Sequence, residues 1–354
     1  MGFLRQTDDD LLPSDRDAFL PAQLIRQANL KTGMFVKAQA RVNSGKGNAV
    51  SKLLEINYQP ADSYQPPVPF ERQISIDPEE RFKLTPARTP EAERSMRFIE
   101  LMVPIGKGQR ALIVAPPKTG KTMLLNDLAQ SVADHHPEAI LIVLLVDERP
   151  EEVTHFRRTV RGLVVASSSD KEATSHLRVA RLTLELARNL AESGKDVFLL
   201  LDSITRLGRA CNREEGNRGK TLSGGVGARA LEFPRKFFGS ARNLEHGGSL
   251  TIVGTALIDT GSRMDEVIFQ EFKGTGNMEL VLDRRPADRR IFPAVDLSQS
   301  GTRKEEKILP EDWLNATRKL RRHLSTLPPM DALEVLLERM EKSPSTQAFC
   351  DSIA

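Results

Sequence analysis

The residues with the clearest chemical potential lie in the stretch 115–122, which reads Ala-Pro-Pro-Lys-Thr-Gly-Lys-Thr. An apolar run, Leu112 to Val114, precedes it and an amphipathic helical pattern follows, so a loop connects a buried strand to a helix. In such a loop, backbone N–H groups and the helix N-terminus face phosphate oxygens. Lys121 is placed to reach the β- and γ-phosphates, and the Thr122 hydroxyl to bind Mg²⁺. The stretch predicts a nucleoside triphosphate site, with Ala115 where the general pattern has glycine.

Two acidic residues come at the ends of other apolar runs. Asp202 directly follows the run 197–201, and Glu148 follows the run 140–146. Because ligands bind at the carboxyl ends of parallel strands, both acids are expected beside the loop. We expect Asp202 to hold the Mg²⁺ shell and Glu148 to activate the water that attacks the γ-phosphate, with Arg149 close to the nucleotide. The alternatives are a helix cap or turn at Asp202 and a charged surface turn at Glu148.

Arginines late in the sequence offer a further catalytic group. Phosphoryl transfer is accelerated by an arginine near the developing charge, and this arginine can come from another subunit. The candidates are Arg284, Arg285, Arg289, Arg290 and Arg303. The sequence does not decide between them, and a solvated basic face is the alternative reading for Arg285 and Arg289.

Two glycine-bearing loops are also basic. One covers residues 217–225, and the other combines 261–263 with 273–276. In a ring-shaped ATPase, such loops could line a central pore and contact a phosphate backbone. As isolated motifs they are unspecific.

The elements that must position these residues follow from the alternation of apolar runs and helical patterns after Val103. This alternation predicts an α/β domain with a mostly parallel sheet. Strands are expected at 112–114, 140–146, 163–165, 197–201, 250–253, 278–282 and 291–295. Helices are expected at 123–132, 151–160, 171–193, 311–322 and 330–342.

The first 58 residues have a different pattern, with short β segments separated by turns. Residues 36–42 alternate, 43–48 form a turn, and 50–56 resume a strand-like run. This spacing favours a small β-barrel, a common platform for single-stranded nucleic acid. Candidate contacts are Phe3 and Phe19 for base stacking and Arg5 and Lys46 for phosphates. The alternative is phenylalanines in a small core and solvated cations.

Between these parts, seven prolines from Pro60 to Pro90 argue against regular structure, apart from a short helix at 91–102. The predicted organisation is therefore a barrel domain at 1–58, a linker at 59–103 and an α/β domain at 104–354.

Composition bounds the class of protein. The 354 residues carry a net charge of +3, so contacts with nucleic acid must come from local basic patches. The two cysteines, Cys211 and Cys350, have no metal-binding spacing. No apolar run reaches the roughly 18 residues of a membrane helix, and we expect a cytoplasmic protein without a membrane partner.

Several motifs together resemble the bacterial transcription termination factor Rho family. They are the stretches 115–122, 147–153, 202–206, 250–265, 271–278 and 300–306. The resemblance runs from Gly2 to near the C-terminus and is most specific over residues 104–306. Ala115 in the phosphate loop is itself a feature of this family.

The resemblance implies a homohexameric ring of RecA-like P-loop ATPase domains, each preceded by an OB-fold (cold-shock-like) barrel. Such a ring binds single-stranded nascent RNA, hydrolyses ATP with Mg²⁺, moves 5′ to 3′ and dislodges RNA polymerase. ATP contacts are implied for Gly106, Lys107, Gly108, Gln109, Arg110, Ala111, Lys118, Thr119, Gly120, Lys121, Thr122, Met123, Arg149 and Phe292. Of these, Phe292 is expected to pack on the adenine.

Individual roles also follow from the resemblance. Glu148 corresponds to the catalytic carboxylate, Asp202 to the Walker B acid, and Arg303 to the arginine finger supplied to the neighbouring subunit's ATP. Lys220 falls in the first pore loop and Arg263 in the second, where the family usually has lysine. That exchange keeps the positive charge and changes the contact geometry.

The N-terminal part matches the family less closely. Phe3, Arg5, Asp17 and Phe19 match its RNA-binding face. The family normally has a helical subdomain and a first barrel strand before this point, and an aromatic residue where this chain reads Gly-Lys-Gly-Asn at 45–48. We therefore expect a curtailed barrel with weakened primary RNA binding, in a short form, a fragment or a chain with a misassigned start codon.

Two other functions are compatible with an NTP site. One is a related hexameric ATPase, such as a rotary ATP synthase subunit, and the motif at 115–118 and the loop around Lys220 argue against it. The other is an RNA-binding regulator whose ATP site acts only as an assembly switch. Glu148, Asp202 and Arg303 argue against that, because a site used only for binding needs no activated water.

Overall fold

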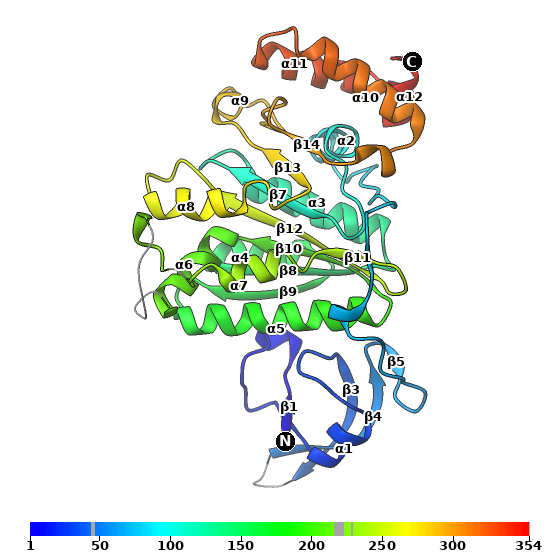
Figure 1. Ribbon diagram of the computed structural model, residues 1–354, viewed down its shortest axis with the longest axis vertical. Helices are drawn as coiled ribbons and strands as arrows, with labels where there is room; N and C mark the ends of the chain where they lie inside the picture. The colour runs from blue at the N-terminus through cyan, green and yellow to red at the C-terminus, as the bar shows by residue number, and fades with distance from the viewer. Residues whose placement is uncertain (44–46, 216–222, 228, 354) are drawn as a thin grey trace.

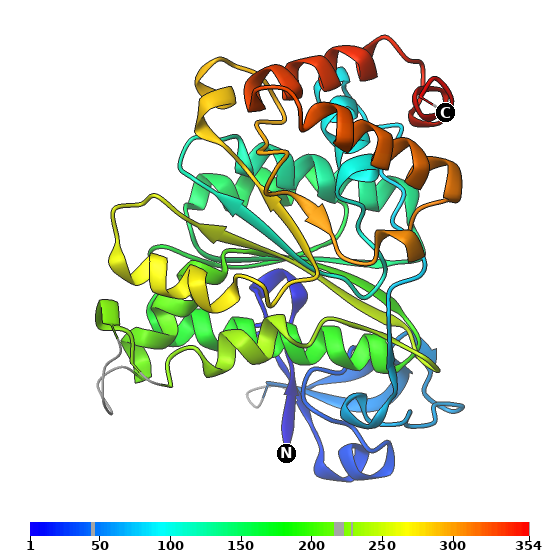
Figure 2. The same cartoon turned by 45° about the horizontal axis from the view of Figure 1, so that its top comes forward.

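The structure is a computed structural model that describes residues 1–43, 47–215, 223–227 and 229–353. A small β-barrel at the N-terminus lies against a larger α/β domain, and three C-terminal helices lie at the opposite end of the molecule (Figure 1, Figure 2). In the described ranges, none of the helices has both the length and the apolar character needed to cross a bilayer.

The barrel is a five-stranded sheet with the order β1-β2-β4-β3, and β5 pairs with β4. Its elements are β1 (Gly2–Leu4), β2 (Ala18–Leu20), α1 (Ala22–Gln27), β3 (Val36–Asn43), β4 (Gly47–Ile56) and β5 (Gln59–Pro60). Inward-facing apolar side chains from β2 and β4, including Leu20 and Ile56, form its own small core. The predicted small barrel is confirmed.

The segment after the barrel is more regular than its prolines predicted. β6 (Ser75–Ile76) pairs antiparallel with β11 (Arg242–Leu244) of the α/β domain. The expected short helix is α2 (Pro90–Met102), and Thr89 caps its start, because the Thr89 side chain accepts a hydrogen bond from the Ala92 N–H. The expected helix is therefore present and packs into the main core, and the expectation of no regular structure was wrong at β6. The domain bounds stay a prediction.

The α/β domain is organised around a nine-stranded sheet with the path β14-β13-β7-β12-β10-β8-β9, extended by β11 and β6. The strands on this path are β7 (Arg110–Ala115), β8 (Ile140–Glu148), β9 (Leu163–Ser168), β10 (Asp196–Asp202), β12 (Ser249–Leu257), β13 (Met278–Val281) and β14 (Gly301–Thr302). All but β14 run parallel to their neighbours on this path. Their carboxyl ends therefore meet at one edge of the sheet, where ligands are expected.

Helices cover both faces of this sheet, as the continuous apolar strands require. One face packs on α2, α3 (Lys121–His135), α4 (Pro150–Thr159) and the C-terminal helices α10 (Glu311–Leu324), α11 (Pro329–Glu341) and α12 (Thr346–Asp351). The other face packs on α5 (Ala173–Glu192), α6 (Ile204–Glu215), α7 (Glu232–Phe238) and α8 (Arg263–Phe272). The predicted α/β class is confirmed.

One predicted strand is wrong. Residues 291–295 follow the short helix α9 (Arg284–Asp288) and contribute only an isolated bridge between Leu282 and Val295. Pro293 lies inside the segment and has no N–H to donate to a ladder, which limits pairing there. The other expected strands are present, and β12 extends beyond the predicted 250–253 at both ends.

Candidate nucleotide site and RNA-binding face

The predicted phosphate loop connects the end of β7 to the start of α3, at residues 116–120. Gly120 has a φ of +83°, and a Cβ built there would lie 3.1 Å from the Phe292 ring. Glycine therefore lets the loop turn beneath that ring. The Thr119 hydroxyl donates to the Pro116 carbonyl at 2.9 Å and closes the loop on itself. The N–H groups at the start of α3 are then available for an anion.

Lys121 lies between two carboxylates that end neighbouring strands. Its Nζ forms an ion pair with Asp202, the last residue of β10, and lies 3.9 Å from Oε1 of Glu148, the last residue of β8. The Thr255 hydroxyl donates to Asp202 Oδ1 at 2.7 Å and fixes its orientation. The structure thus brings together the predicted P-loop lysine, Walker B acid and catalytic carboxylate.

Glu148 is the most perturbed of these groups. Its side chain is almost fully buried, and burial together with the Asp202 carboxylate raises the pKa of Glu148 to about 7. The cations Lys121 and Arg206 act in the opposite direction, with an Arg206 guanidinium nitrogen 3.2 Å from Glu148 Oε1. A buried carboxylate with a pKa near neutrality is suited to accept a proton from water at physiological pH.

Three other predicted nucleotide contacts lie on the same side of the sheet. The Thr122 hydroxyl donates to Glu152 Oε2 at 3.2 Å, and Met123, the next residue of α3, is 58% exposed. Arg149 is exposed at the residue that precedes α4. The predicted Mg²⁺ ligands, the Thr122 hydroxyl and the Asp202 carboxylate, are oxygen donors of the kind that Mg²⁺ prefers.

The predicted RNA-binding residues of the barrel also come together. Phe3 on β1 is directly opposite Phe19 on β2, with ring centroids 6.0 Å apart, and the two rings are 52% and 37% exposed. Arg5 forms an ion pair with Asp17, and its guanidinium lies 5.5 Å from the centroid of the Phe3 ring. Exposed aromatic rings beside a cation are the arrangement that binds single-stranded nucleic acid. Lys46 lies outside the described residues.

Comparison with known proteins assigns both parts of the chain. Residues 1–62 match the Rho termination factor RNA-binding domain, and residues 95–302 match the nucleotide-binding domain of the ATP synthase alpha/beta family. The transcription termination factor Rho of Cereibacter sphaeroides is 48% identical over 354 residues, which cover 99% of this chain and 84% of that protein. The chain belongs to the Rho family. The Rho protein of Pseudomonas aeruginosa is 46% identical, with the same coverage of both chains.

Solved structures agree on the fold of the ATPase part of this Rho family chain. A type III secretion system ATPase of pathogenic bacteria superposes with a TM-score of 0.67 at 21% identity, over 79% of this chain and 86% of that chain. The ATPase EscN of enteropathogenic E. coli gives a TM-score of 0.64, also at 21% identity, over 86% of this chain and 76% of that chain. At this identity the likeness shows a shared fold.

The remaining predicted ATP contacts of this Rho family chain lie at the opposite edge of the sheet. Residues 106–109 lead into β7, which begins with Arg110 and Ala111, and this six-residue strand separates residues 106–109 from the phosphate loop by roughly 20 Å. Here Lys107 forms ion pairs with Glu80 and Asp196 at 2.7 and 2.8 Å. Gln109 is fully buried. The structure does not bring this segment to the phosphate loop of the same chain.

Arg303 lies at that same opposite edge. Its backbone N–H donates to the Asn277 carbonyl at 2.8 Å, just before β13 begins. The Asn277 side chain in turn accepts from the Arg110 N–H, also at 2.8 Å. Through Asn277, Arg303 lies beside the segment 106–111 and away from its own phosphate loop, and its side chain is exposed.

The predicted pore-loop residues are only partly described. Arg263 is exposed as the first residue of α8, beyond the carboxyl end of β12. The loop behind it is braced by an ion pair between Arg209 and Asp265, which also accepts from the Thr260 hydroxyl at 2.6 Å. Lys220 lies outside the described residues.

Sequence reasoning missed the contacts that hold the acids in place. Arg206, Glu152 and Thr255 each touch a predicted catalytic or metal-binding residue, and none had been assigned a role. Arg206 belongs to the motif at 202–206, so its proximity to Asp202 along the chain was the available signal. The reach of Thr255 to Asp202 depends on the pairing of β10 with β12, which no local pattern reveals.

Proposed function

We propose that this chain is an RNA-stimulated ATPase of the Rho type, which moves along nascent RNA in the 5′ to 3′ direction and releases it from RNA polymerase. It acts in the cytoplasm as a homohexameric ring, with ATP and Mg²⁺. The observation that carries the proposal is the pair of buried carboxylates Glu148 and Asp202 around Lys121, on a chain that also has a Rho RNA-binding domain.

Binding of ATP uses the phosphate loop and the face of Phe292. Backbone N–H groups at the start of α3 and the Lys121 ammonium hold the phosphates. Phosphate oxygens compete with Asp202 for Lys121, and Asp202 is then available to the Mg²⁺ shell with the Thr122 hydroxyl. Mg²⁺ held by these two residues would neutralise charge that develops on the phosphates.

Hydrolysis depends on Glu148. Its carboxylate accepts a hydrogen bond and then a proton from the attacking water, while Arg206 holds it in place at 3.2 Å. A site that only sensed nucleotide would have no use for a buried base with a pKa near 7. This distinction favours turnover over an assembly switch.

A ring explains why the predicted ATP contacts divide between two edges of the sheet. Arg303 and the segment 106–111 lie together at the edge away from their own phosphate loop. In a head-to-tail ring this edge faces the phosphate loop of the next subunit, and Arg303 then acts on the neighbour's γ-phosphate. The exposed Arg263, at the other edge, contributes to the pore with Lys220.

Steady-state ATP hydrolysis with and without single-stranded RNA tests this function. The wild-type protein is expected to hydrolyse ATP faster when RNA is added. Glu148→Gln, which keeps the size and one hydrogen-bonding oxygen of the side chain, should retain ATP binding and lose hydrolysis by a factor of about 10²–10⁴.

Other results would contradict the proposal in distinct ways. Equal rates with and without RNA would refute the coupling of turnover to RNA. Tight ATP binding without any turnover in the wild-type protein would establish the assembly switch instead. A strand-displacement assay then tests movement. Duplexes with a 5′ single-stranded RNA overhang should be unwound, and duplexes with a 3′ overhang should not.

A further inference from the structure

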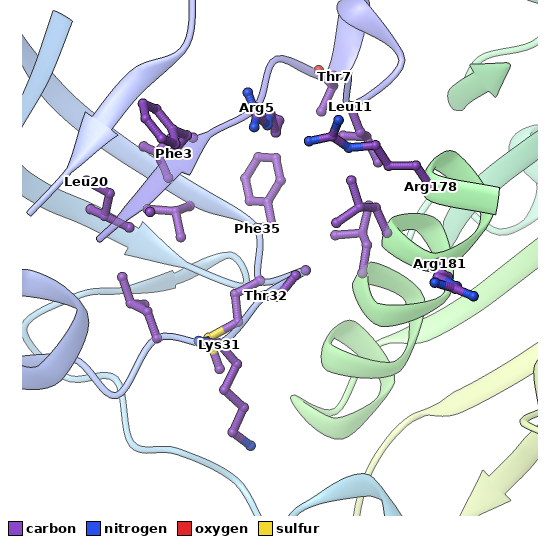
Figure 3. Close-up of a pocket in the computed structure, with 18 of the residues that line it drawn as sticks. Phe3, Arg5, Thr7, Leu11, Leu20, Lys31, Thr32, Phe35, Arg178 and Arg181 are labelled. Atoms are coloured by element: carbon purple, nitrogen blue, oxygen red, sulfur yellow. The ribbon is translucent and has the colours of Figure 1, made fainter. Parts of the chain in front are cut away.

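A cavity of about 840 Å³ lies between the N-terminal barrel and helix α5 of the ATPase domain (Figure 3). We call it the barrel–α5 hollow. From the barrel, residues 1–5 and 30–36 line it, and from the ATPase domain the N-terminal part of α5. Its volume is within the range of pockets that bind ligands of nucleotide size. It is separate from the phosphate loop, which lies on the other face of the sheet with α3.

One end of the barrel–α5 hollow is closed by direct contact between a barrel loop and the helix. Gly33 has a φ of +85°, and a Cβ built on it would lie 2.6 Å from Glu185 Cβ and 2.7 Å from the Glu185 carbonyl carbon. Only glycine allows this approach. The Asn189 side chain donates to the Thr32 carbonyl at 3.0 Å beside it. The barrel and α5 are therefore joined at this point and form fixed walls.

Aromatic rings stand on the barrel side of the hollow. Phe3 lies at its edge and is half exposed, and the Phe35 ring stands between the barrel and α5 (Figure 3). Phe35 is held by stacking on Tyr58, with centroids 4.4 Å apart and an interplanar angle of 9°. A ring fixed in this way can stack on a nucleobase at little cost in side-chain entropy.

The charges around the hollow favour an anion. The charged residues that line it are Arg5, Lys31, Arg178, Arg181 and Glu214. Lys31 is already 3.5 Å from Glu192. Arg178 is exposed on α5, has no acidic partner within the described part of the chain, and extends into the hollow (Figure 3). A guanidinium so placed can bind a phosphate in a bidentate manner.

We propose that the barrel–α5 hollow is a nucleotide subsite for RNA. One nucleotide of the bound strand places its base against Phe35 and its phosphate on Arg178, so helix α5 of the ATPase domain forms part of the RNA-binding surface. The proposal rests on the RNA-binding function proposed above, and it adds a subsite that lies outside the barrel face of Phe3 and Phe19.

RNA is favoured over a free nucleotide as the occupant because Phe3 belongs to both surfaces. It pairs with Phe19 on the barrel face and also lines the hollow. An RNA strand whose base stacks on Phe3 can therefore continue directly into the hollow. An RNA strand and a free nucleotide both offer a base and a phosphate. They differ in whether neighbouring nucleotides add to the affinity.

The test is binding of a fluorescein-labelled ten-nucleotide single-stranded RNA to the full chain without ATP, measured by anisotropy over a range of salt concentrations. Arg178→Ala should raise the Kd roughly three- to fivefold, the worth of one exposed ion pair. It should also reduce the slope of log K against log salt by about 0.7, the value for one lost contact with a single strand. Arg178→Glu should weaken binding further.

Arg322→Ala is the matched control, because Arg322 is also an exposed helix arginine and lies on α10, at the far end of the molecule from the barrel. It should leave both Kd and salt slope unchanged. Equal Kd values and slopes for Arg178→Ala and wild type would overturn the subsite. No RNA binding by the wild type would instead refute the RNA-binding function, so the two failures are distinguishable.

Photocrosslinking locates the strand and separates the two sources. An RNA with one 4-thiouridine should crosslink to the peptide containing 173–192 or 30–36, as well as to the barrel face. Crosslinks confined to the barrel face would contradict the proposal. Cytidine monophosphate at millimolar concentration should compete poorly with the oligonucleotide, and competition as strong as that of the oligonucleotide would assign the hollow to a free nucleotide and overturn its assignment to RNA.

Discussion

Arg206 provides a sharp test of the proposed mechanism, because it is the cation that contacts Glu148 without belonging to the phosphate loop. The guanidinium lies 3.2 Å from Glu148 Oε1 and favours the ionised carboxylate. Arg206→Gln removes the charge and keeps a hydrogen-bond donor on a shorter side chain. The pKa of Glu148, already raised to about 7 by burial and by Asp202, should then rise further.

The size of the shift follows from the geometry. Two unit charges at this separation attract by about 5 kcal/mol at an effective dielectric constant of 20, which is an upper bound. The Arg206 side chain is 25% exposed, so solvent screens part of this attraction. Measured effects of an opposite charge at such distances are about one to three pKa units, or about 1.4–4 kcal/mol. We therefore expect a shift of at least about one unit.

The assay is the pH dependence of kcat at saturating ATP and RNA. Because the ionised carboxylate is the base, kcat should rise with pH through the pKa of Glu148 and then level off. In Arg206→Gln the rising limb should move to higher pH while the plateau remains. Arg213→Gln is the control, since Arg213 lies 3.7 Å from Asp147, the residue before Glu148, and forms no ion pair with Glu148 itself. An unchanged or lower midpoint in Arg206→Gln would refute the assigned role of the pair.

Three further predictions address other parts of the molecule. If Arg303 acts on the neighbour's ATP, mixed rings of Arg303→Ala and Lys121→Ala subunits should recover part of the hydrolysis that each lacks alone; mixed rings without any recovery would contradict action in trans. Gly108→Ala should lower the free energy of unfolding by about 2–4 kcal/mol in denaturant titrations, because Gly108 has a φ of +90° and a Cβ there would lie 2.3 Å from the Asn243 nitrogen. Phe292→Ala should raise the KM for ATP roughly tenfold through loss of base stacking, and an unchanged KM would remove Phe292 from the base site.

The sequence was informative wherever a local pattern carried the chemistry. The loop at 115–122 and the acids Glu148 and Asp202 could be predicted because apolar runs mark buried strands and polar residues follow their carboxyl ends. The contact between Asp202 and Thr255 could not, since it depends on which strands are neighbours. The pairing of β6 with β11 escaped prediction for the same reason, because it joins residues far apart in sequence.

The division of the predicted ATP contacts between two edges of the sheet shows a further limit. A resemblance assigned Lys107 and Lys121 to one ligand, and strand β7 holds them apart. Sequence motifs indicate that residues serve the same reaction. They do not indicate whether these residues come from one subunit or from two. The geometry shows that one chain does not bring Lys107 to its own phosphate loop, because a strand has a fixed rise per residue. The subunit-mixing experiment with Arg303 and Lys121 therefore tests an inference that the motif alone could not yield.

Helix α5 connects the barrel–α5 hollow to the catalytic edge. Arg178 lies on its exposed side, and His176, two residues earlier, is fully buried with its Nε2 3.8 Å from Asp147 Oδ1, beside Glu148. The helix also packs on β8 and β10, which end in Glu148 and Asp202. An RNA strand bound to Arg178 therefore contacts helix α5, which supports both carboxylates. If RNA stimulates hydrolysis through this route, Arg178→Ala should reduce the stimulation at saturating RNA as well as the affinity. A loss of affinity alone would place the coupling elsewhere.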